Sequence, residues 1–447
     1  MINSLLVGVC FMNLKLKKIG FILIIISSLL FPILQVLFIV GINSNYLIKF
    51  PIFVTICIFN IIFTISLILG INLFIKNRKA DKNKLKGWIK YIYSIFLTIY
   101  IVGCVSFITI LYGPYGKFRT WLITTAMGTM NHQYLCKWFY NEAQINSILN
   151  QNYIVESEEN TDPELIHQQV VDNNNEVVDN YNEYEKELLI HEEDELYKIV
   201  KFEVNGADAY IAAIFDPAKV KLEVTNKLGV LGEYVTKMAE RNNAILAINA
   251  GGFTDNGNNL GESPTGITIK NGEILTNNEY GFAVSSGGLI GLTKDNVLVL
   301  LKNVTAEEAI EIGVRDAVSW GPFLIVNGEP SVVSGNGGWG LAARSAIGQR
   351  KDGTILLLQV GSNYSRTTGA GMVDLVEIMQ RYGAYNASNL DGGTSSVLAL
   401  RREEAINNWG ATCHDYFTKY ACAINDAIDS AGIHQTRYVA DAWIVVE

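Results

Sequence analysis

The sequence lacks the common fingerprints of nucleotide and metal chemistry. It contains no P-loop, no zinc-finger pattern, no dinucleotide-binding glycine motif and no internal repeat. Histidine is scarce, and His414 and His434 are too isolated to form a metal-binding set. The region after residue 196 has no basic stripe, which argues against a nucleic-acid partner. We therefore predict no metal site, no required cofactor and no nucleic-acid binding.

Acidic residues are missing from three long apolar stretches near the N-terminus, although the chain carries 44 of them and a net charge of −9. Residues 19–40, 50–75 and 89–112 each reach the roughly 20 apolar residues that cross a bilayer. Lysines gather before the first stretch and between the second and third, which places these parts in the cytoplasm. The alternative for residues 15–28 is a cleaved signal peptide. We predict an N-terminal anchor of three transmembrane helices over residues 1–112, a multi-pass location in the cell membrane with the bilayer as a partner, and an extracytoplasmic C-terminal domain.

Two segments connect this anchor to the rest of the chain. Residues 113–150 are rich in aromatic side chains, including Trp121 and Trp138, which is typical of an interfacial amphipathic segment. Residues 151–196 are dominated by acidic and amide side chains, which predicts a flexible acidic stalk with a marginal helix at its end. Cys413 and Cys422, nine residues apart, could pair or remain free thiols.

Residues 197–447 change to short β-rich runs, glycine turns and a few amphipathic helices. Strands are expected at 199–204, 209–215, 244–249, 355–360 and 438–446, and a helix at 233–242. Met372, Leu375, Val376 and Met379 have helical spacing. Strands alternate with helices in places and with hairpins in others, so the fold class is mixed α/β (α+β).

Five polar or glycine-rich motifs follow predicted strands, where loops present side chains and backbone N–H groups. Each alone has a structural explanation, because paired glycines often only form a turn and an Arg or Asp there often only caps or pairs. The motifs are Asn249-Ala250-Gly251-Gly252-Phe253, Pro264-Thr265-Gly266, Gly321-Pro322-Phe323-Leu324, Ala343-Arg344-Ser345-Ala346-Ile347-Gly348 and Leu390-Asp391-Gly392-Gly393-Thr394-Ser395-Ser396.

In this order the motifs resemble the phosphodiester glycosidase family. That family includes the uncovering enzyme, N-acetylglucosamine-1-phosphodiester alpha-N-acetylglucosaminidase, and membrane-anchored bacterial relatives linked to exopolysaccharide biosynthesis. The resemblance covers residues 197–447, and Leu390–Gly393 and Arg344–Gly348 are its most specific parts. It implies hydrolysis of the bond between a sugar's anomeric carbon and a phosphodiester. The implied partner is a sugar phosphodiester or a surface polysaccharide.

The chemistry of this reaction suggests roles for the motif residues. Asp391 is the expected nucleophile or base, and Arg344 the cation for the departing phosphate. Further substrate contacts are expected from backbone N–H groups, acting as an anion nest, and from polar side chains. These are Gly251, Gly252, Gly392, Gly393, Asn249, Thr394 and Ser395. Glu262 and Asp255 are second-tier carboxylates, and a divalent cation could help to hold phosphate although nothing requires one.

Two departures from the family pattern bear on activity. Many relatives carry Asp-Gly-Arg after the strand at 355–360, whereas this chain reads Gly361-Ser362-Asn363-Tyr364-Ser365-Arg366. Either Arg366 replaces that contact from a shifted position or the contact is lost. Residues 413–435 resemble an insertion. Two alternatives to hydrolysis remain open: a non-catalytic glycan-binding or sensory module, and a glycosyl or phosphoglycosyl transferase in exopolysaccharide assembly.

Overall fold

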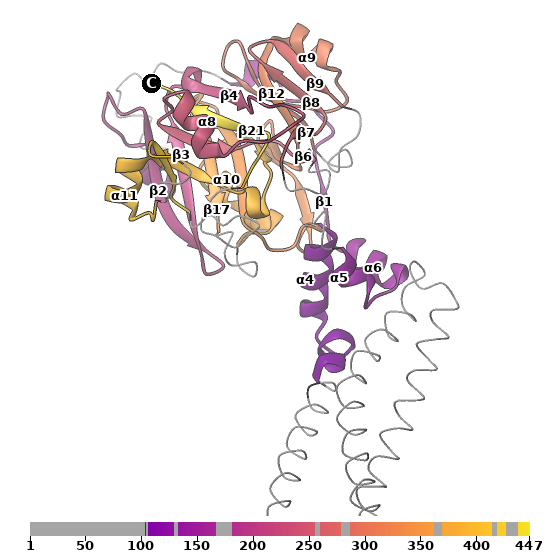
Figure 1. Cartoon of the computed structure of the whole chain (residues 1–447). Helices are drawn as coiled ribbons and strands as arrows, with labels where there is room; N and C mark the ends of the chain where they lie inside the picture. Colours follow the sequence, from indigo (N-terminus) through magenta and orange to yellow (C-terminus); the bar gives the residue numbers. More distant parts are fainter. Residues whose placement is uncertain are drawn as a thin grey trace, which may run out of the picture. The chain divides into compact units, whose positions relative to one another are not determined.

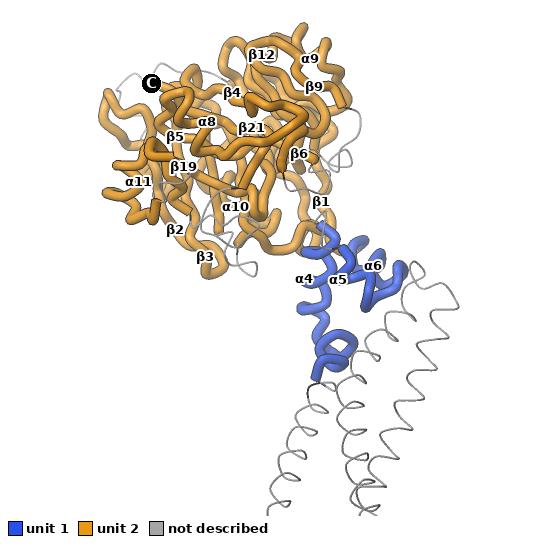
Figure 2. Tube along the Cα trace, viewed as in Figure 1, with its two compact units in different colours: residues 1–150 blue, residues 151–447 orange. Residues whose placement is uncertain are grey.

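The computed structural model describes residues 103, 106–128, 133–166, 181–254, 260–278, 287–361, 369–413, 418–425 and 437–447. The chain divides into two compact units, residues 1–150 and residues 151–447 (Figures 1 and 2).

The predicted membrane anchor is corrected by the structure. Within the described residues, no helix is both long enough and apolar enough to cross a bilayer. Helix α4 (Gly116–Met127) has 12 residues and is about 18 Å long, whereas a hydrocarbon core is about 30 Å thick. The stretches at 19–40 and 50–75, and most of 89–112, lie outside the described residues. The three-helix anchor, the bilayer partner, the multi-pass location and the extracytoplasmic placement that depended on them are therefore withdrawn.

The described part of residues 1–150 is helical. Helix α4 is followed by α5 (Tyr134–Lys137) and α6 (Glu142–Leu149). Asn141 and Gln144 form a capping box at the start of α6, which satisfies two backbone donors there. A small core joins these helices through Leu111, Ile123, Ala126, Cys136, Tyr140 and Ile145. The aromatic segment predicted at 113–150 thus has its own packed interior.

The described part of residues 151–447 contains three larger antiparallel sheets together with helices, which confirms the predicted mixed α/β class. The seven-stranded sheet comprises β2 (Tyr197–Val204), β3 (Ala207–Ile214), β13 (Phe323–Val326), β14 (Glu329–Pro330), β16 (Arg344–Arg350), β17 (Ile355–Val360) and β18 (Ala384–Asn389), in the order β14-β13-β18-β16-β17-β3-β2. A five-stranded sheet comprises β4 (Val220–Val224), β5 (Leu246–Asn249), β19 (Leu398–Arg401), β20 (Ala421–Ala423) and β21 (Asp441–Val445), in the order β20-β19-β5-β21-β4. The other comprises β8 (Ile267–Lys270), β9 (Glu273–Asn277), β10 (Gly288–Thr293), β11 (Leu298–Leu301) and β12 (Val314–Trp320), in the order β11-β10-β12-β8-β9.

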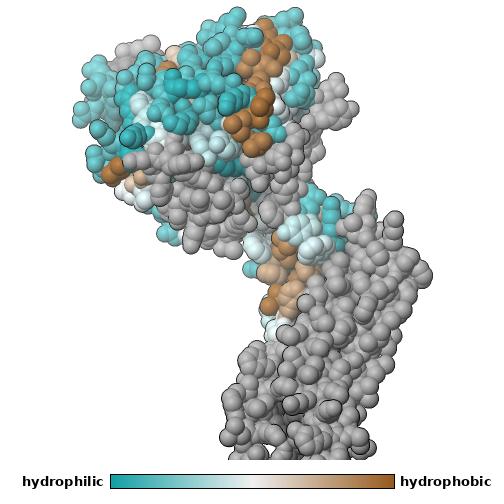
Figure 3. All heavy atoms as spheres, in the orientation of Figure 1, coloured by the Kyte–Doolittle hydropathy of each residue, from teal (hydrophilic) through white to brown (hydrophobic). Residues whose placement is uncertain are grey.

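The first two sheets pack face to face, with a helix on the outside of each. Alternate residues of β3 separate between two cores, as strand geometry requires: Tyr210 and Ala212 face the β5 sheet, and Ile211 faces helix α10 (Met372–Arg381). Helix α8 (Val235–Arg241) covers the outer face of the β5 sheet through a third core that includes Val235. The visible surface of this unit is mainly hydrophilic (Figure 3).

The predicted helical spacing is confirmed in α10. Met372, Leu375, Val376 and Met379 are all buried against the seven-stranded sheet. The two ends of helix α9 (Ala306–Ile312) are also set by local sequence. Thr305 and Glu308 form a capping box at its start, and Gly313 ends the helix in a left-handed conformation.

Much of the segment predicted as an acidic stalk is packed within the second unit. Strand β1 (Tyr153–Val155) pairs with β15 (Val332–Ser334). Both carboxylate oxygens of Glu156 accept hydrogen bonds from the backbone N–H of Gly287 at 2.9 Å, and Oε2 also accepts one from Phe323 at 3.0 Å. Helix α7 (Glu183–Leu189) buries Leu188 and Leu189. Its Glu185 accepts a hydrogen bond from Arg350 at 2.6 Å. The acidic composition concealed these specific partners.

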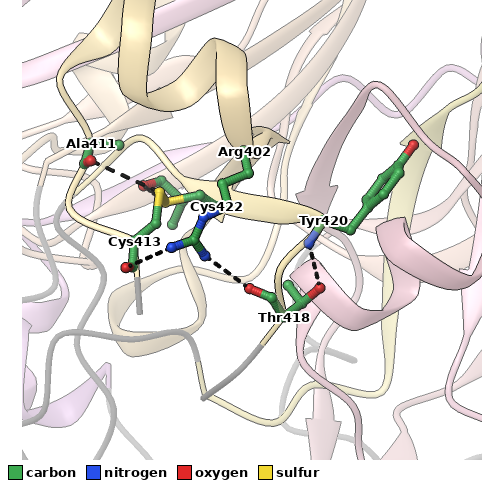
Figure 4. The surroundings of a disulfide bond; sticks show 7 residues. Arg402, Ala411, Cys413, Thr418, Tyr420 and Cys422 are labelled. Atoms are coloured by element: carbon green, nitrogen blue, oxygen red, sulfur yellow. Dashed lines mark hydrogen bonds between the residues drawn. A yellow bond between two sulfur atoms is a disulfide. The ribbon is translucent and has the colours of Figure 1, made fainter. Parts of the chain in front are cut away.

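Cys413 and Cys422, left open by the sequence, form a disulfide (Figure 4). It joins the segment after helix α11 (Arg402–Trp409) to β20. Arg402 supports the same loop, because its Nη2 donates to the Cys413 carbonyl and its Nη1 to the Thr418 carbonyl, each at 3.2 Å.

Candidate active site

The predicted motifs meet where the two packed sheets are joined by loops. Strand β5 ends at Asn249, and β18 ends two residues before Asp391. The chain then passes through the turn η5 (Gly393–Ser395) into β19, so residues 390–396 cross from the seven-stranded sheet to the β5 sheet. The N–H of Asp391 donates to the Ala250 carbonyl at 3.0 Å, which ties the two loops together. The half-buried residues Asp391 to Thr394 form the accessible edge of this junction.

Asn249 holds the Asp391 loop through hydrogen bonds within the protein. It is 1% exposed. Its Nδ2 donates to the Asp391 carbonyl at 2.6 Å, and its Oδ1 accepts hydrogen bonds from the Ser345 hydroxyl at 2.7 Å and the Val397 N–H at 3.1 Å. Asn249 thus belongs to a network that holds Asp391, and its contact with sugar hydroxyls stays a prediction.

The four glycine N–H groups expected to form an anion nest all donate within the protein. Gly251 donates to Asp441 Oδ1 at 2.7 Å. Gly392 donates to Asp391 Oδ1 at 3.0 Å. Gly252 and Gly393 donate to the backbone carbonyls of Ser319 and Ala343, at 3.4 and 2.7 Å. The glycines are needed for space instead: a Cβ on Gly252 would lie 1.7 Å from the Trp320 ring, and one on Gly392 would lie 2.8 Å from the Ala343 carbonyl oxygen.

Arg344 lies behind the Asp391 loop as a buried cation. Its Nε donates to the Ala370 carbonyl at 3.2 Å, and its Nη2 to the carbonyls of Trp339 and Gly340 at 2.7 and 3.2 Å. Its Nη1 lies toward Gly392, because a Cβ built there would be 3.4 Å away. Burial lowers the pKa of Arg344 to about 10, and the charge of Asp391 acts in the opposite direction. Arg344 therefore stays positive at neutral pH, with several donors committed to the backbone.

Asp441, at the start of β21, is a carboxylate that the sequence reasoning did not identify. It is 1% exposed. Its Oδ2 is buried, and the part of the chain that the structure describes offers it no hydrogen-bond partner. Burial raises the pKa of Asp441 to about 7; the Gly251 N–H opposes this rise, and the charge of Asp391 adds to it. The sequence signal that could have identified Asp441 is its place in an otherwise apolar strand, because burying an unpaired charge there costs free energy.

Thr394 and Ser395 differ in access. Thr394 is half-buried, whereas Ser395 is buried in the η5 turn. Thr394 has a neighbour that the sequence reasoning missed, Arg437, whose Nη1 donates to Thr394 Oγ1 at 3.4 Å. The Arg437 guanidinium lies 4.8 Å from the centre of the Phe253 ring. Arg437 thereby places a second cation at the junction.

Of the second-tier residues, Glu262 is the one that the structure describes. Glu262 is buried beside the hairpin of β6 (Phe253–Thr254) and β7 (Ser263–Pro264). The carboxylate that acts on Arg344 and Asp441 is Asp391, and Glu262 is not among their electrostatic neighbours. Asp255 and Arg366 lie outside the described residues, as do His414 and His434.

A cavity of about 460 Å³ lies elsewhere, at the opposite ends of β5 and β19. Its lining includes Tyr197, Ile245, Arg401, Glu404 and Trp409. The length of these strands separates it from Asp391, so we place the candidate site at the loop junction. In the described ranges, no group of three or more His, Cys, Asp or Glu is arranged to hold a metal ion.

Known proteins resemble this chain over the region that carries the site. Residues 242–446 match the family model described as phosphodiester glycosidase, so the resemblance is confirmed over that segment. The SPbeta prophage-derived uncharacterized protein YomE of Bacillus subtilis (strain 168) is 30% identical over 199 residues, which are 43% of this chain and 29% of that protein. The chain thus spans less than a third of the length of this relative.

Solved structures also match this chain, with TM-scores below 0.5. The zebrafish N-acetylglucosamine-1-phosphodiester alpha-N-acetylglucosaminidase catalytic domain, auto-inhibited by its pro-peptide, is 19% identical with a TM-score of 0.43, covering 57% of this chain and 85% of that chain. A hypothetical protein from Synechocystis is 16% identical with a TM-score of 0.34, covering 56% of this chain and 62% of that chain. The family match supports a glycosidase-type function for residues 242–446.

Proposed function

Taking residues 242–446 as a phosphodiester glycosidase domain, we propose that the protein hydrolyses the bond between the anomeric carbon of a sugar and a phosphodiester, in a sugar-phosphate polymer or glycan. One observation carries the proposal most directly. The Asp391 loop, within the family-matched segment, sets one half-buried carboxylate against a buried cation, Arg344, and a second buried carboxylate, Asp441. Perturbed ionisable groups around an accessible carboxylate are typical of catalytic sites.

In the proposed reaction, the bond from the anomeric carbon to the phosphate oxygen breaks, and a bond from that carbon to the oxygen of water replaces it. That oxygen leaves with the bonding electrons as part of a phosphomonoester. Asp391 either accepts the proton of the attacking water or first bonds the carbon as a nucleophile, the two roles that carboxylates take in glycoside hydrolysis. Because a phosphomonoester is already a stable anion, positive charge matters more than a strong general acid.

Arg344 supplies part of that charge from behind the loop. A fixed guanidinium in a water-poor setting stabilises developing negative charge without reorganising. Its backbone bonds hold it in place, and the Trp339 ring lies 5.8 Å from its guanidinium carbon. Asp441 has a positioning role, because it binds the N–H of Gly251, next to the Ala250 carbonyl that holds Asp391.

The test is to incubate the purified protein with sugar 1-phosphodiesters in oxygen-18-labelled water. The benzyl phosphodiesters of N-acetylglucosamine 1-phosphate and glucose 1-phosphate are suitable probes. We expect free sugar carrying the label and an unlabelled phosphomonoester, because the bond to carbon breaks. Label in the phosphate would instead indicate cleavage at phosphorus and contradict the proposal. Binding without turnover would favour the glycan-binding module, and turnover only with an added sugar acceptor would favour the transferase.

A further inference from the structure

An anionic substrate needs positive partners near Asp391, and this inference rests on the proposed function. The glycine N–H groups of both loops already donate within the protein. Arg344 is 5% exposed and directs three hydrogen bonds at backbone carbonyls. The direct contact with phosphate must therefore come from another group at the accessible edge of the junction.

Arg437 has the position that this contact requires. It precedes β21 and reaches the η5 turn, where its Nη1 donates to Thr394 Oγ1 at 3.4 Å. Both side chains are half-buried, so neither is shut away from solvent. Thr394 follows Asp391 by three residues in the same half-buried stretch of loop. The cation therefore contacts the same loop that carries Asp391, the carboxylate expected to act on the sugar carbon.

The ring beneath Arg437 also suits an anion-binding role. The guanidinium carbon lies 4.8 Å from the centre of the Phe253 ring, a distance typical of cation–π contact. A guanidinium presents its N–H groups in one plane, in a fork that matches two phosphate oxygens. Phe253 directly follows Gly251 and Gly252, so Arg437 bridges the two loops that form the site.

We propose that Arg437, with the Thr394 hydroxyl beside it, binds the phosphoryl group of the substrate directly, while Arg344 supports the Asp391 loop from behind. This assigns the substrate's phosphate to the side of the loop that faces Phe253. A merely structural Arg437, tying Thr394 to Phe253, would affect the binding of charged and neutral sugars alike. The two roles therefore differ in a measurable selectivity.

The experiment compares wild type with Arg437→Met and Arg437→Lys in calorimetric titrations. The ligands are N-acetylglucosamine 1-phosphate and glucose 1-phosphate, each paired with the neutral methyl glycoside of the same sugar. Arg381→Met is the matched control. Arg381 is on helix α10, outside the site, and its guanidinium likewise lies near an aromatic ring, 4.7 Å from the centre of the Tyr184 ring. Thermal unfolding of each variant confirms that the fold is retained.

We expect Arg437→Met to weaken sugar 1-phosphate binding about 10- to 100-fold relative to the methyl glycoside, the scale of a charge-assisted hydrogen bond. Arg437→Lys should keep part of the preference, and Arg381→Met all of it. Where wild type turns over a phosphodiester, Arg437→Met should raise KM more than it lowers kcat. An unchanged preference, or an equal loss for both ligands, overturns the assignment. Failure of wild type to hydrolyse any probe would contradict the proposed function alone, because the binding preference still decides the role of Arg437.

Discussion

Two buried carboxylates on adjacent strands of one sheet differ in their partners, because among the described residues one pairs with cations and the other does not. Glu223 on β4 and Asp441 on β21 are 4% and 1% exposed. In the register, Ala442 lies opposite Glu223 and Asp441 lies opposite Val224, so the two carboxylates point to opposite faces. Glu223 meets Arg241 at 2.7 Å and Lys270 at 2.6 Å. Asp441 meets one N–H and the charge of another carboxylate.

The pKa values follow the partners, because burial is common to both groups. Burial acts to raise the pKa of Glu223, but hydrogen bonds from Lys270 and Arg241 leave it below its ordinary value. Burial raises the pKa of Asp441 to about 7, and among the described residues it is the Gly251 N–H, not a cation, that opposes this rise. The first arrangement stabilises the fold. The second holds unfavourable electrostatics beside a loop, which is typical of functional sites.

The largest expected effect comes from Asp391→Asn. Since Asn249 and Ala250 bind the backbone of residue 391, the loop should keep its shape. Loss of the carboxylate should lower kcat for a sugar phosphodiester roughly 10³- to 10⁵-fold, the scale for removing a reacting group. Asp208→Asn, an exposed carboxylate paired with Lys201, serves as the control. A variant that retains more than about a tenth of wild-type kcat would remove Asp391 from the reaction.

Asp441→Asn should change how stability depends on pH. Asp441 has an ordinary pKa near 3.9 when unfolded and about 7 when folded. Between these values the folded state binds a proton that the unfolded chain has lost, so its contribution to the free energy of unfolding falls as pH rises. Wild type should therefore lose roughly 2–4 kcal/mol relative to Asp441→Asn between about pH 4 and pH 8. Urea denaturation across this range measures the difference, and parallel curves would refute it.

Glu223→Gln should produce the opposite pattern. Removing the carboxylate leaves Arg241 and Lys270 partly buried without their shared partner, at 24% and 27% side-chain exposure. We expect a loss of about 1–3 kcal/mol at neutral pH, reduced from the fully buried case by solvent screening. Because the pKa of Glu223 is lowered on folding, this loss should shrink as pH falls through the acid range. Activity should be unchanged, and a large fall in kcat would break the proposed contrast.

Lys270→Met should have the smallest effect, below about 1 kcal/mol. Arg241 still pairs with Glu223 in this variant, at 2.7 Å. The methionine keeps most of the apolar stem of the lysine. A cost equal to that of Glu223→Gln would show that Lys270 alone satisfies the carboxylate. Chemical denaturation of the two variants side by side makes the comparison.

Local patterns in the sequence predicted several elements correctly but left their long-range partners undetermined. The spacing of Met372, Leu375, Val376 and Met379 predicted α10, and apolar runs predicted the strands observed as β2, β3, β5, β17 and β21. The order of those strands could not be read, because pairing such as β3 with β17 joins residues more than a hundred positions apart. The acidic composition of residues 151–196 likewise concealed the partners of Glu156 and Glu185, which lie far along the chain.

The candidate site was predicted in position more than in detail. Asp391 and Arg344 are brought together as the motifs suggested. The glycine N–H groups donate within the protein, and a motif alone does not show which donors are already used. Asp441 was overlooked because its significance depends on Gly251, which lies 190 residues away. Arg437 was overlooked for the same reason, since Thr394 and Phe253 meet only in the folded chain.

The contacts of Glu156 and β1 determine how long a gene fragment must be to encode a complete domain. The family-matched segment begins at residue 242, but β2, β3 and β4 come earlier in the chain. A gene fragment encoding only that segment would leave the edge of β17 uncovered, and open edges recruit other chains into aggregates. A fragment beginning at residue 197 would restore that edge but still strip β15 of its partner and Phe323 of its acceptor. A gene fusion or recombination that moves this domain into another protein would therefore need to include the sequence from about residue 151 onward.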